Sequence, residues 1–172
     1  MNPVNVMYWV LLIRDRLIEL DPTHAHIYTA NADAYLDELT VLVDDFVIPL
    51  VETLPQDKRI LIASHDSLGY LKANFGFRLV GTIIPSGTTL AEPSTQDIAR
   101  IIDLVQSEEV PAIFSETTGN DNIAQAIADE TDAQLVVLYS DALSDENGSA
   151  PTYIDFIRSN FTAIIEALAS GS

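Results

Sequence analysis

The chain has 172 residues, of which 48% are hydrophobic, enough to form one domain with a sizeable core. Its 26 acidic residues outnumber its 8 basic residues and give a formal net charge of −18, which disfavours nucleic acid and anionic lipid as partners. The sequence contains no cysteine, so disulfide bonds and thiolate metal ligands are excluded.

Two helical segments are predicted in residues 1–54. Asn2 and Pro3 suit a helix start, because asparagine is a good N-cap and proline fits the first helical turn. The first helix is apolar over nearly its whole circumference and therefore needs cover on more than one side. A break at Pro22 separates it from a second helical stretch that ends at about Thr53. We expect a long helical hairpin with an exposed first helix.

Neither a membrane span nor an export signal is expected within the chain. The longest apolar run near the start, Val6 to Ile13, is far shorter than the roughly 18 to 20 residues that cross a bilayer. The first residues have no basic leader and no small-residue cleavage site.

From Arg59 onward, short apolar strands alternate with helices, which predicts an α/β lobe over residues 55–172. The predicted strands are Arg59 to Ser64, Arg78 to Ile84, Ala112 to Ser115 and Gln134 to Tyr139, with a turn at Pro85-Ser86-Gly87 after the second. The predicted helices are Ser67 to Asn74, Ser94 to Ser107, Asn120 to Glu130 and Thr152 to Ala169. Right-handed crossovers favour a four-stranded parallel sheet in the order 2-1-3-4, flanked by helices, with its topological switch point between strands one and three.

An imidazole and two carboxylates follow three of these strands. His65 comes after the first strand, Glu116 after the third and Asp141 after the fourth, and the carboxyl ends of parallel strands share one edge. Singly, each has a structural explanation: a loop or helix cap for His65, a helix N-terminal charge for Glu116, and a solvated turn for Asp141. Two carboxylates brought together cost free energy unless a proton or cation lies between them. Their convergence therefore indicates a metal site.

Other chemistries have less support. The glycines match neither phosphate-binding fingerprint. Ser64, Ser67 and Ser115 lack the spacing of a nucleophile elbow, and His24 and His26 are two positions apart and point in different directions on a helix. A metal-dependent hydrolase would need a general base near the sheet edge, and no spare base is evident. We therefore expect a binding protein and not an enzyme.

The ordered motifs resemble the metal-binding solute-binding proteins of ABC transporters for manganese, zinc and ferrous iron. The matching stretches are Asn2-Pro3-Val4-Asn5, Leu20-Asp21-Pro22, Ser64-His65-Asp66, Gly69-Tyr70-Leu71, Phe75-Gly76-Phe77, Glu92-Pro93-Ser94, Ile113-Phe114-Ser115-Glu116 and the helix from Tyr153 to Asn160. The resemblance covers essentially the whole chain. It implies two lobes joined by a long backbone helix, with one metal ion held between the lobes by four side chains.

The same resemblance assigns the metal ligands. His65 matches the second histidine ligand of the family, Glu116 the third ligand and Asp141 the fourth, whereas the first ligand belongs to an N-terminal lobe that has no counterpart here. The chain is therefore expected to be the backbone helix plus the C-terminal lobe. Two carboxylates favour Mn²⁺, with Zn²⁺ next and Fe²⁺ third, and zinc-selective relatives often have a histidine in place of Glu116.

The resemblance also implies a role. The complete protein would capture a divalent metal ion in the periplasm or at the cell surface and deliver it to the permease of an ABC transporter. With one ligand and one cleft wall absent, this chain is expected to bind metal weakly. The alternative is a truncated interaction module without transport activity, a homo-oligomer that self-associates through its exposed first helix around Val6 to Ile13.

Overall fold

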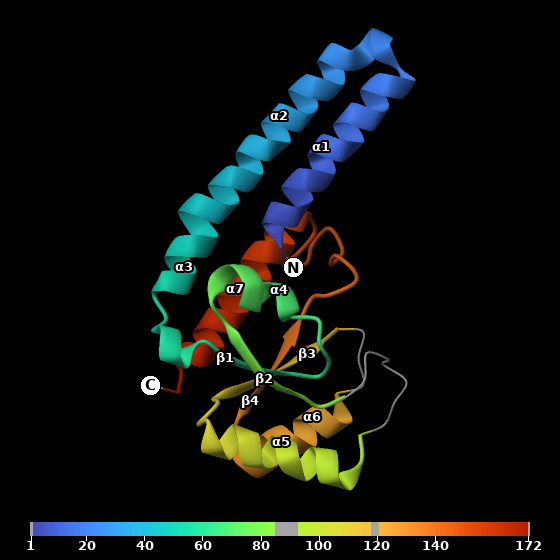
Figure 1. The fold of residues 1–172 in the computed structure, drawn as a ribbon. Helices are drawn as coiled ribbons and strands as arrows, with labels where there is room; N and C mark the ends of the chain where they lie inside the picture. The colour runs from blue at the N-terminus through green and yellow to red at the C-terminus, as the bar shows by residue number, and fades with distance from the viewer. Residues whose placement is uncertain (1, 85–92, 118–120, 172) are drawn as a thin grey trace. The chain divides into compact units, whose positions relative to one another are not determined.

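The structure is a computed structural model that describes residues 2–84, 93–117 and 121–171. It divides into two compact units, one of residues 2–49 and one of residues 50–172 (Figure 1). The turn predicted at Pro85-Ser86-Gly87, Glu92 of the resemblance and the predicted helix start at Asn120 lie outside the described residues.

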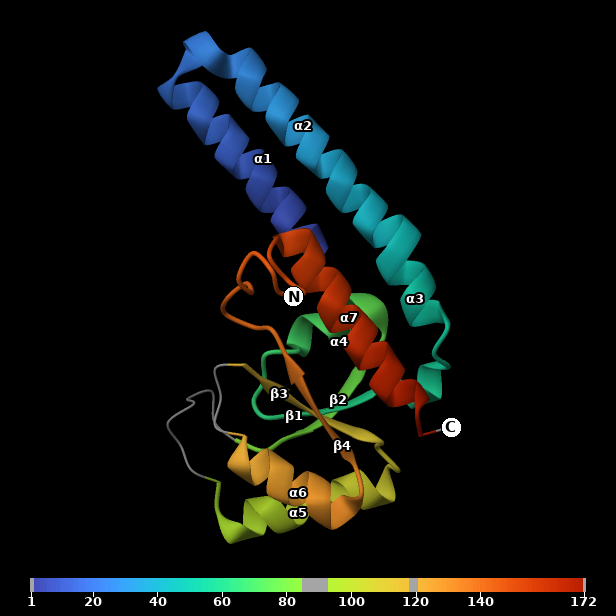
Figure 2. The ribbon, with the colours of Figure 1, turned by 180° about the vertical axis from the view of Figure 1, so that it is seen from behind.

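The first unit is a helical hairpin. Helix α1 (Pro3–Leu20) and helix α2 (Ala25–Val41) lie side by side in both Figures 1 and 2, joined by the short 3-10 helix η1 (Pro22–His24). The Asn2 side chain accepts a hydrogen bond from the Val4 backbone N–H at 3.1 Å, so α1 begins at the predicted cap.

The sequence predicted one continuous second helix, but the structure divides this stretch into three segments. After α2 the chain passes through a π-helical segment, η2 (Leu42–Val47), and then enters helix α3 (Ile48–Glu52). The sequence analysis missed this change because the spacing of hydrophobic residues does not distinguish an α-helix from a π-helix over so short a stretch.

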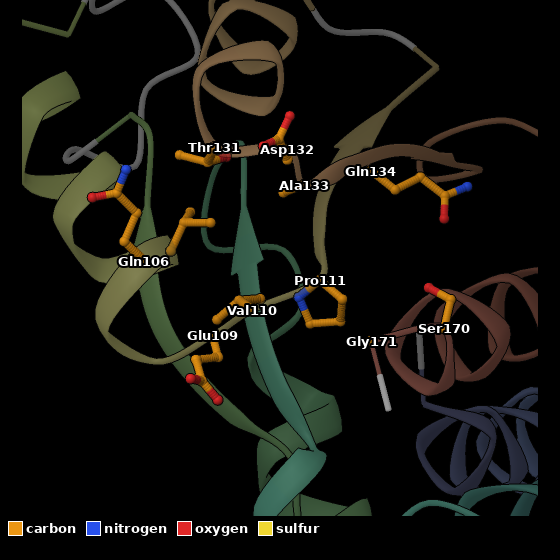
Figure 3. A pocket seen from close by; sticks show the side chains of 11 residues that line it. Gln106, Glu109, Val110, Pro111, Thr131, Asp132, Ala133, Gln134, Ser170 and Gly171 are labelled. Atoms are coloured by element: carbon orange, nitrogen blue, oxygen red, sulfur yellow. The ribbon is translucent and has the colours of Figure 1, made fainter.

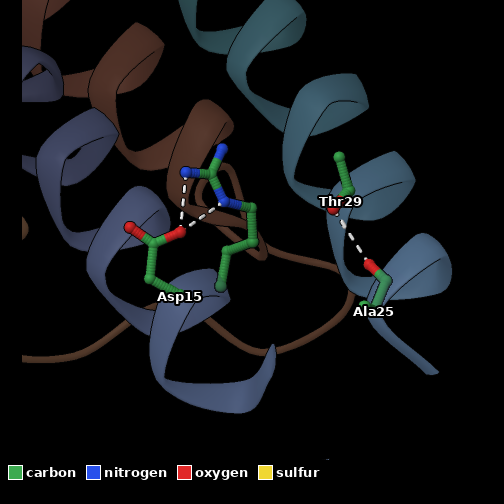
Figure 4. A network of polar contacts seen from close by, with 4 residues as sticks. Asp15, Ala25 and Thr29 are labelled. Atoms are coloured by element: carbon green, nitrogen blue, oxygen red, sulfur yellow. Dashed lines mark hydrogen bonds and ion pairs between the residues drawn. The ribbon is translucent and has the colours of Figure 1, made fainter. Parts of the chain in front are cut away.

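Polar contacts stabilise the turn of the hairpin, and α1 also exposes several large apolar side chains. The Asp21 carboxylate accepts hydrogen bonds from His24 Nδ1 at 2.6 Å and from the Tyr28 hydroxyl at 2.9 Å. Figure 4 shows two further contacts, the Arg14–Asp15 ion pair at 2.7 Å and the hydrogen bond from the Thr29 hydroxyl to the Ala25 carbonyl at 2.9 Å. The large apolar side chains exposed on α1 are Tyr8, Trp9, Leu12, Ile13, Leu17 and Leu20. None of the described helices is both long and apolar enough to span a membrane.

The second unit contains the predicted sheet. Its strands are β1 (Ile60–Ala63), β2 (Arg78–Thr82), β3 (Ala112–Glu116) and β4 (Gln134–Leu138). They are all parallel and lie in the order β2-β1-β3-β4, which confirms the predicted topology. The helices of this unit are the 3-10 helix η3 (Gln56–Lys58) and the α-helices α4 (Gly69–Phe75), α5 (Thr95–Ser107), α6 (Asn122–Thr131) and α7 (Tyr153–Ala169).

Helices cover both faces of the sheet (Figures 1 and 2). The crossover from β1 to β2 runs in one direction along the sheet, and the crossovers from β2 to β3 and from β3 to β4 run in the opposite direction. Because each crossover is right-handed, α4 lies on one face of the sheet and α5 and α6 lie on the other. The core under α5 and α6 includes Ile62, Ile113 and Ile127, all almost fully buried. On the other face, the rings of Phe75 from α4 and Phe161 from α7 meet edge to face, with centroids 5.1 Å apart.

Candidate metal centre

Two of the three predicted ligands lie next to each other. His65 follows β1 and Glu116 is the last residue of β3, and these two strands are neighbours at the centre of the sheet. His65 Nε2 lies 3.4 Å from Glu116 Oε1, longer than a good N–H···O hydrogen bond. The Glu116 side chain is 8% exposed and the His65 side chain 28% exposed, so the carboxylate is buried and the imidazole faces partly into solvent.

Backbone contacts explain why the pair forms. The Ser64 N–H donates to the Phe114 carbonyl at 2.8 Å, which continues the β1–β3 pairing one residue past β1. The chain then turns, because the Ser67 N–H donates to the His65 carbonyl at 2.9 Å. Glu116 shares a face of the sheet with Phe114, since side chains alternate along a strand, and that face is covered by helices. The position at the strand end therefore brings His65 beside a buried carboxylate.

Asp141 lies in the loop that follows β4, on the same edge of the sheet. It is exposed and makes no hydrogen bond or ion pair within the described part of the chain. Among the described residues, no group of three or more histidine, aspartate or glutamate side chains is close enough to hold a metal ion. The structure thus brings His65 and Glu116 together without Asp141, whose role as a ligand stays a prediction.

One residue near the site was missed by the sequence analysis. Asn160 on α7 is 1% exposed, and its side chain makes two hydrogen bonds to the backbone of Tyr139, just after β4. The available signal was a polar residue at helical spacing on the same face as Phe156, Ile157, Phe161 and Ile164, because a buried amide must find partners. The sequence did not reveal which partners those would be.

The hollow in Figure 3 is a separate feature. It has a volume of about 440 Å³ and is lined by residues such as Val110, Pro111 and Gln134, which precede or begin β3 and β4. It therefore lies at the amino edge of the sheet, opposite His65 and Glu116. Glu109 and Asp132, also in its lining, have positive φ of 51° and 56° and follow the ends of α5 and α6, where a left-handed residue commonly ends a helix.

Taken together, a parallel α/β unit, a long helical hairpin before it and an imidazole–carboxylate pair at the carboxyl edge are the features of a metal-binding solute-binding protein. Comparison with known proteins identifies the family: residues 1–167 match the family described as ZnuA, zinc-uptake complex component A, periplasmic, and the chain belongs to that family.

Relatives and solved structures agree with this assignment. The chain is 34% identical over 166 residues to the manganese-binding lipoprotein MntA of Halalkalibacterium halodurans, covering 96% of this chain and 54% of the relative. It is 34% identical over 172 residues to the iron-binding protein YfeA of Yersinia pestis, covering 99% and 53%. The structure of a manganese-bound periplasmic metal binding protein from Candidatus Liberibacter asiaticus superimposes with a TM-score of 0.82 at 32% identity, covering 97% of this chain and 61% of that one.

The chain spans about half the length of the curated relatives it matches. The matched proteins are described as metal-binding, which agrees with the solute-binding interpretation of the sequence. Nothing in these comparisons supports the alternative of a self-associating interaction module.

Proposed function

We propose that the complete protein captures a divalent metal ion outside the cytoplasmic membrane and delivers it to the permease of an ABC transporter. This chain supplies His65, Glu116 and Asp141 as metal ligands and acts without enzymatic chemistry. The observation that carries the proposal is the contact between His65 Nε2 and Glu116 Oε1 at 3.4 Å, at the carboxyl edge of the sheet.

The separation of these two atoms suits a shared metal ion. Two ligand atoms at about 2.1 Å from a tetrahedrally coordinated ion are about 3.4 Å apart, and about 3.0 Å apart in octahedral coordination. The observed 3.4 Å therefore needs little or no movement of the backbone when a metal ion binds between the two groups. A direct hydrogen bond would bring the same atoms closer.

The burial of Glu116 also supports a cation at this position. A carboxylate with 8% exposure has lost most of its hydration, and its ion-pair partner in the described structure is an imidazole that carries no fixed charge. A divalent cation would restore the lost electrostatic stabilisation. The net charge of −18 raises the local cation concentration around the protein and acts in the same direction.

Asp141 is proposed to complete the set of ligands when metal binds. Its exposed position in the loop after β4 leaves the carboxylate free to turn toward the pair. Together the three groups supply one nitrogen and up to four oxygens, a donor set suited to Mn²⁺ and Fe²⁺. Relatives named for manganese and iron binding support this choice. Zn²⁺ remains the second choice, because most nitrogen and oxygen sites bind it more tightly than Mn²⁺.

Isothermal titration with MnCl₂ and ZnCl₂ tests the proposal on the 172-residue chain. His65→Ala, Glu116→Gln and Asp141→Asn should each lower the affinity at least about tenfold, as expected when one ligand of a small set is lost. Glu130→Gln is the matched control, since it removes one negative charge from an exposed position on α6 and should leave the affinity unchanged. Equal binding by wild type and all three site variants would exclude this metal site.

A further inference from the structure

The side chain of Asn160 binds the backbone of a single residue with both of its polar atoms. Asn160 Oδ1 accepts a hydrogen bond from the Tyr139 N–H at 2.9 Å, and Asn160 Nδ2 donates one to the Tyr139 carbonyl at 2.9 Å. Asn160 lies in the interior of α7 and is 1% exposed, so its amide is shielded from water, while Tyr139 is half-buried. A buried pair of this kind is expensive to break, because the freed groups would lose their partners.

These bonds form just after the pairing between β3 and β4 ends at Leu138. The Thr117 N–H donates to the Leu138 carbonyl at 3.1 Å, which is the contact just beyond the β3–β4 ladder. In an extended chain the N–H and C=O of one residue point to the same side, and successive residues alternate. Tyr139 therefore turns both groups away from β3, and the Asn160 amide takes the place that another strand would occupy.

We infer that Asn160 is a positioning residue for Asp141, and this inference rests on the proposed function of Asp141 as a metal ligand. Asp141 follows Tyr139 by two residues, and consecutive Cα atoms are about 3.8 Å apart, so fixing Tyr139 confines the Asp141 backbone to a small region. Since Asp141 has no hydrogen bond of its own within the described residues, its direction depends on how the chain leaves β4.

The far end of the same loop is held by the same helix. The Thr152 hydroxyl accepts a hydrogen bond from the Asp155 N–H at 3.2 Å and so caps α7. Between the two ends, the Ser144 N–H donates to the Ala150 carbonyl at 2.9 Å and the Tyr139 hydroxyl contacts Ser149 Oγ at 3.0 Å. Helix α7 thus anchors both ends of a compact surface loop that carries Asp141.

Asn160→Asp is the variant of choice because it is nearly isosteric. The carboxylate still accepts from the Tyr139 N–H but cannot donate to the Tyr139 carbonyl, so one of the two bonds is replaced by a repulsive contact. Asn74→Asp is the matched control, since the Asn74 side chain also donates to a backbone carbonyl, that of Tyr70 at 3.1 Å, from an exposed position on another helix. If Asn160→Asp does not fold, Asn160→Ser takes its place, because its smaller side chain leaves room for water.

The first measurement needs no metal. In ¹⁵N relaxation experiments on the metal-free chain, the backbone order parameter of Asp141 should fall from a rigid value near 0.85 to below about 0.6 in Asn160→Asp. The control Asn74→Asp should leave it unchanged. An unchanged order parameter and unchanged chemical shifts at Asp141 in a folded Asn160 variant would overturn the inference.

The second measurement is a double-mutant cycle with ZnCl₂. Asn160→Asp should lower the zinc affinity about tenfold when Asp141 is present, as loss of an outer-shell partner usually does. In the Asp141→Ala background the same substitution should change the affinity less than about twofold. Equal losses in both backgrounds would mean that Asn160 does not act through Asp141, and would refute the inference.

A wild-type chain that binds no zinc through His65 and Glu116 would refute the proposed function, while the relaxation experiment would still decide whether Asn160 fixes Asp141.

Discussion

Replacing Glu116 by glutamine should stabilise the metal-free chain and weaken its stabilisation by metal. The Glu116 side chain is 8% exposed and lies 3.4 Å from His65 Nε2, so its carboxylate is largely dehydrated without a full opposite charge beside it. Glutamine has nearly the same shape and no charge. We expect the free energy of unfolding in excess EDTA to rise by about 1 kcal/mol, within the range of substitutions that relieve a functional site.

This change translates into a measurable shift of the melting temperature. For a chain of 172 residues, about 1 kcal/mol corresponds to a shift of about 2 to 4 °C. With free ZnCl₂ at about 100 times the wild-type dissociation constant, the wild type should gain about 2.7 kcal/mol. An affinity at least about tenfold lower limits the gain of Glu116→Gln to about 1.4 kcal/mol or less. The order of the two melting temperatures should therefore reverse when zinc replaces EDTA.

Circular dichroism melts in EDTA and in ZnCl₂ measure both effects, with Glu130→Gln as the charge-matched control. If Glu116→Gln melts below the wild type in EDTA and is stabilised by zinc as much as the wild type, the buried carboxylate is a structural element and not part of a metal site. That result would also remove the physical basis for placing a cation beside His65.

Three further predictions concern the α/β unit. Phe161→Ala should lower the free energy of unfolding, measured in urea, by about 3 to 5 kcal/mol, because it removes a fully buried ring and leaves a cavity. Hydrogen bonds from the Ser94 hydroxyl and backbone N–H lower the pKa of Asp97 below its ordinary 3.8, so this cap stabilises α5 at pH values above the ordinary pKa and is lost as the pH falls through the lowered value. In Asp97→Asn, the free energy of unfolding should therefore fall less as the pH is lowered through that window. The same fall in the variant as in the wild type would show that the cap does not contribute. Gly76→Ala should lower the free energy of unfolding by about 1 to 2 kcal/mol, because Gly76 has φ of 71°. Gly69 starts α4 without a positive φ, so Gly69→Ala should change the free energy of unfolding by less than about 0.5 kcal/mol. Equal effects of the two substitutions would contradict the conformational explanation.

The sheet could be predicted because local signals and topology agreed. Short apolar segments alternating with helices required parallel strands, and right-handed crossovers left the order 2-1-3-4, which the structure confirms. The proximity of His65 and Glu116 followed from the same rule, since both lie at the carboxyl ends of adjacent central strands. One general rule of α/β folds therefore produced both the architecture and the first two members of the candidate site.

Other features depended on contacts that no sequence pattern encodes. The π-helical segment Leu42–Val47 differs from an α-helix only in its hydrogen-bond spacing, and its residues are ordinary for either. The partner of Asn160 is a backbone group far away in the sequence, so the amide reveals only that it needs partners. Asp141 lies in a loop, where direction is determined by such contacts rather than by a repeating pattern.

The backbone conformation of Glu109 suggests a site for stabilising the protein by substitution. It occupies the left-handed backbone region, with φ of 51°, beside the hollow at the amino edge. Glutamate tolerates this conformation less well than aspartate or glycine. Glycine at this position would remove conformational strain and one surplus negative charge, remote from every proposed donor atom. Stability could therefore be raised at the amino edge of the sheet, opposite the proposed donor atoms.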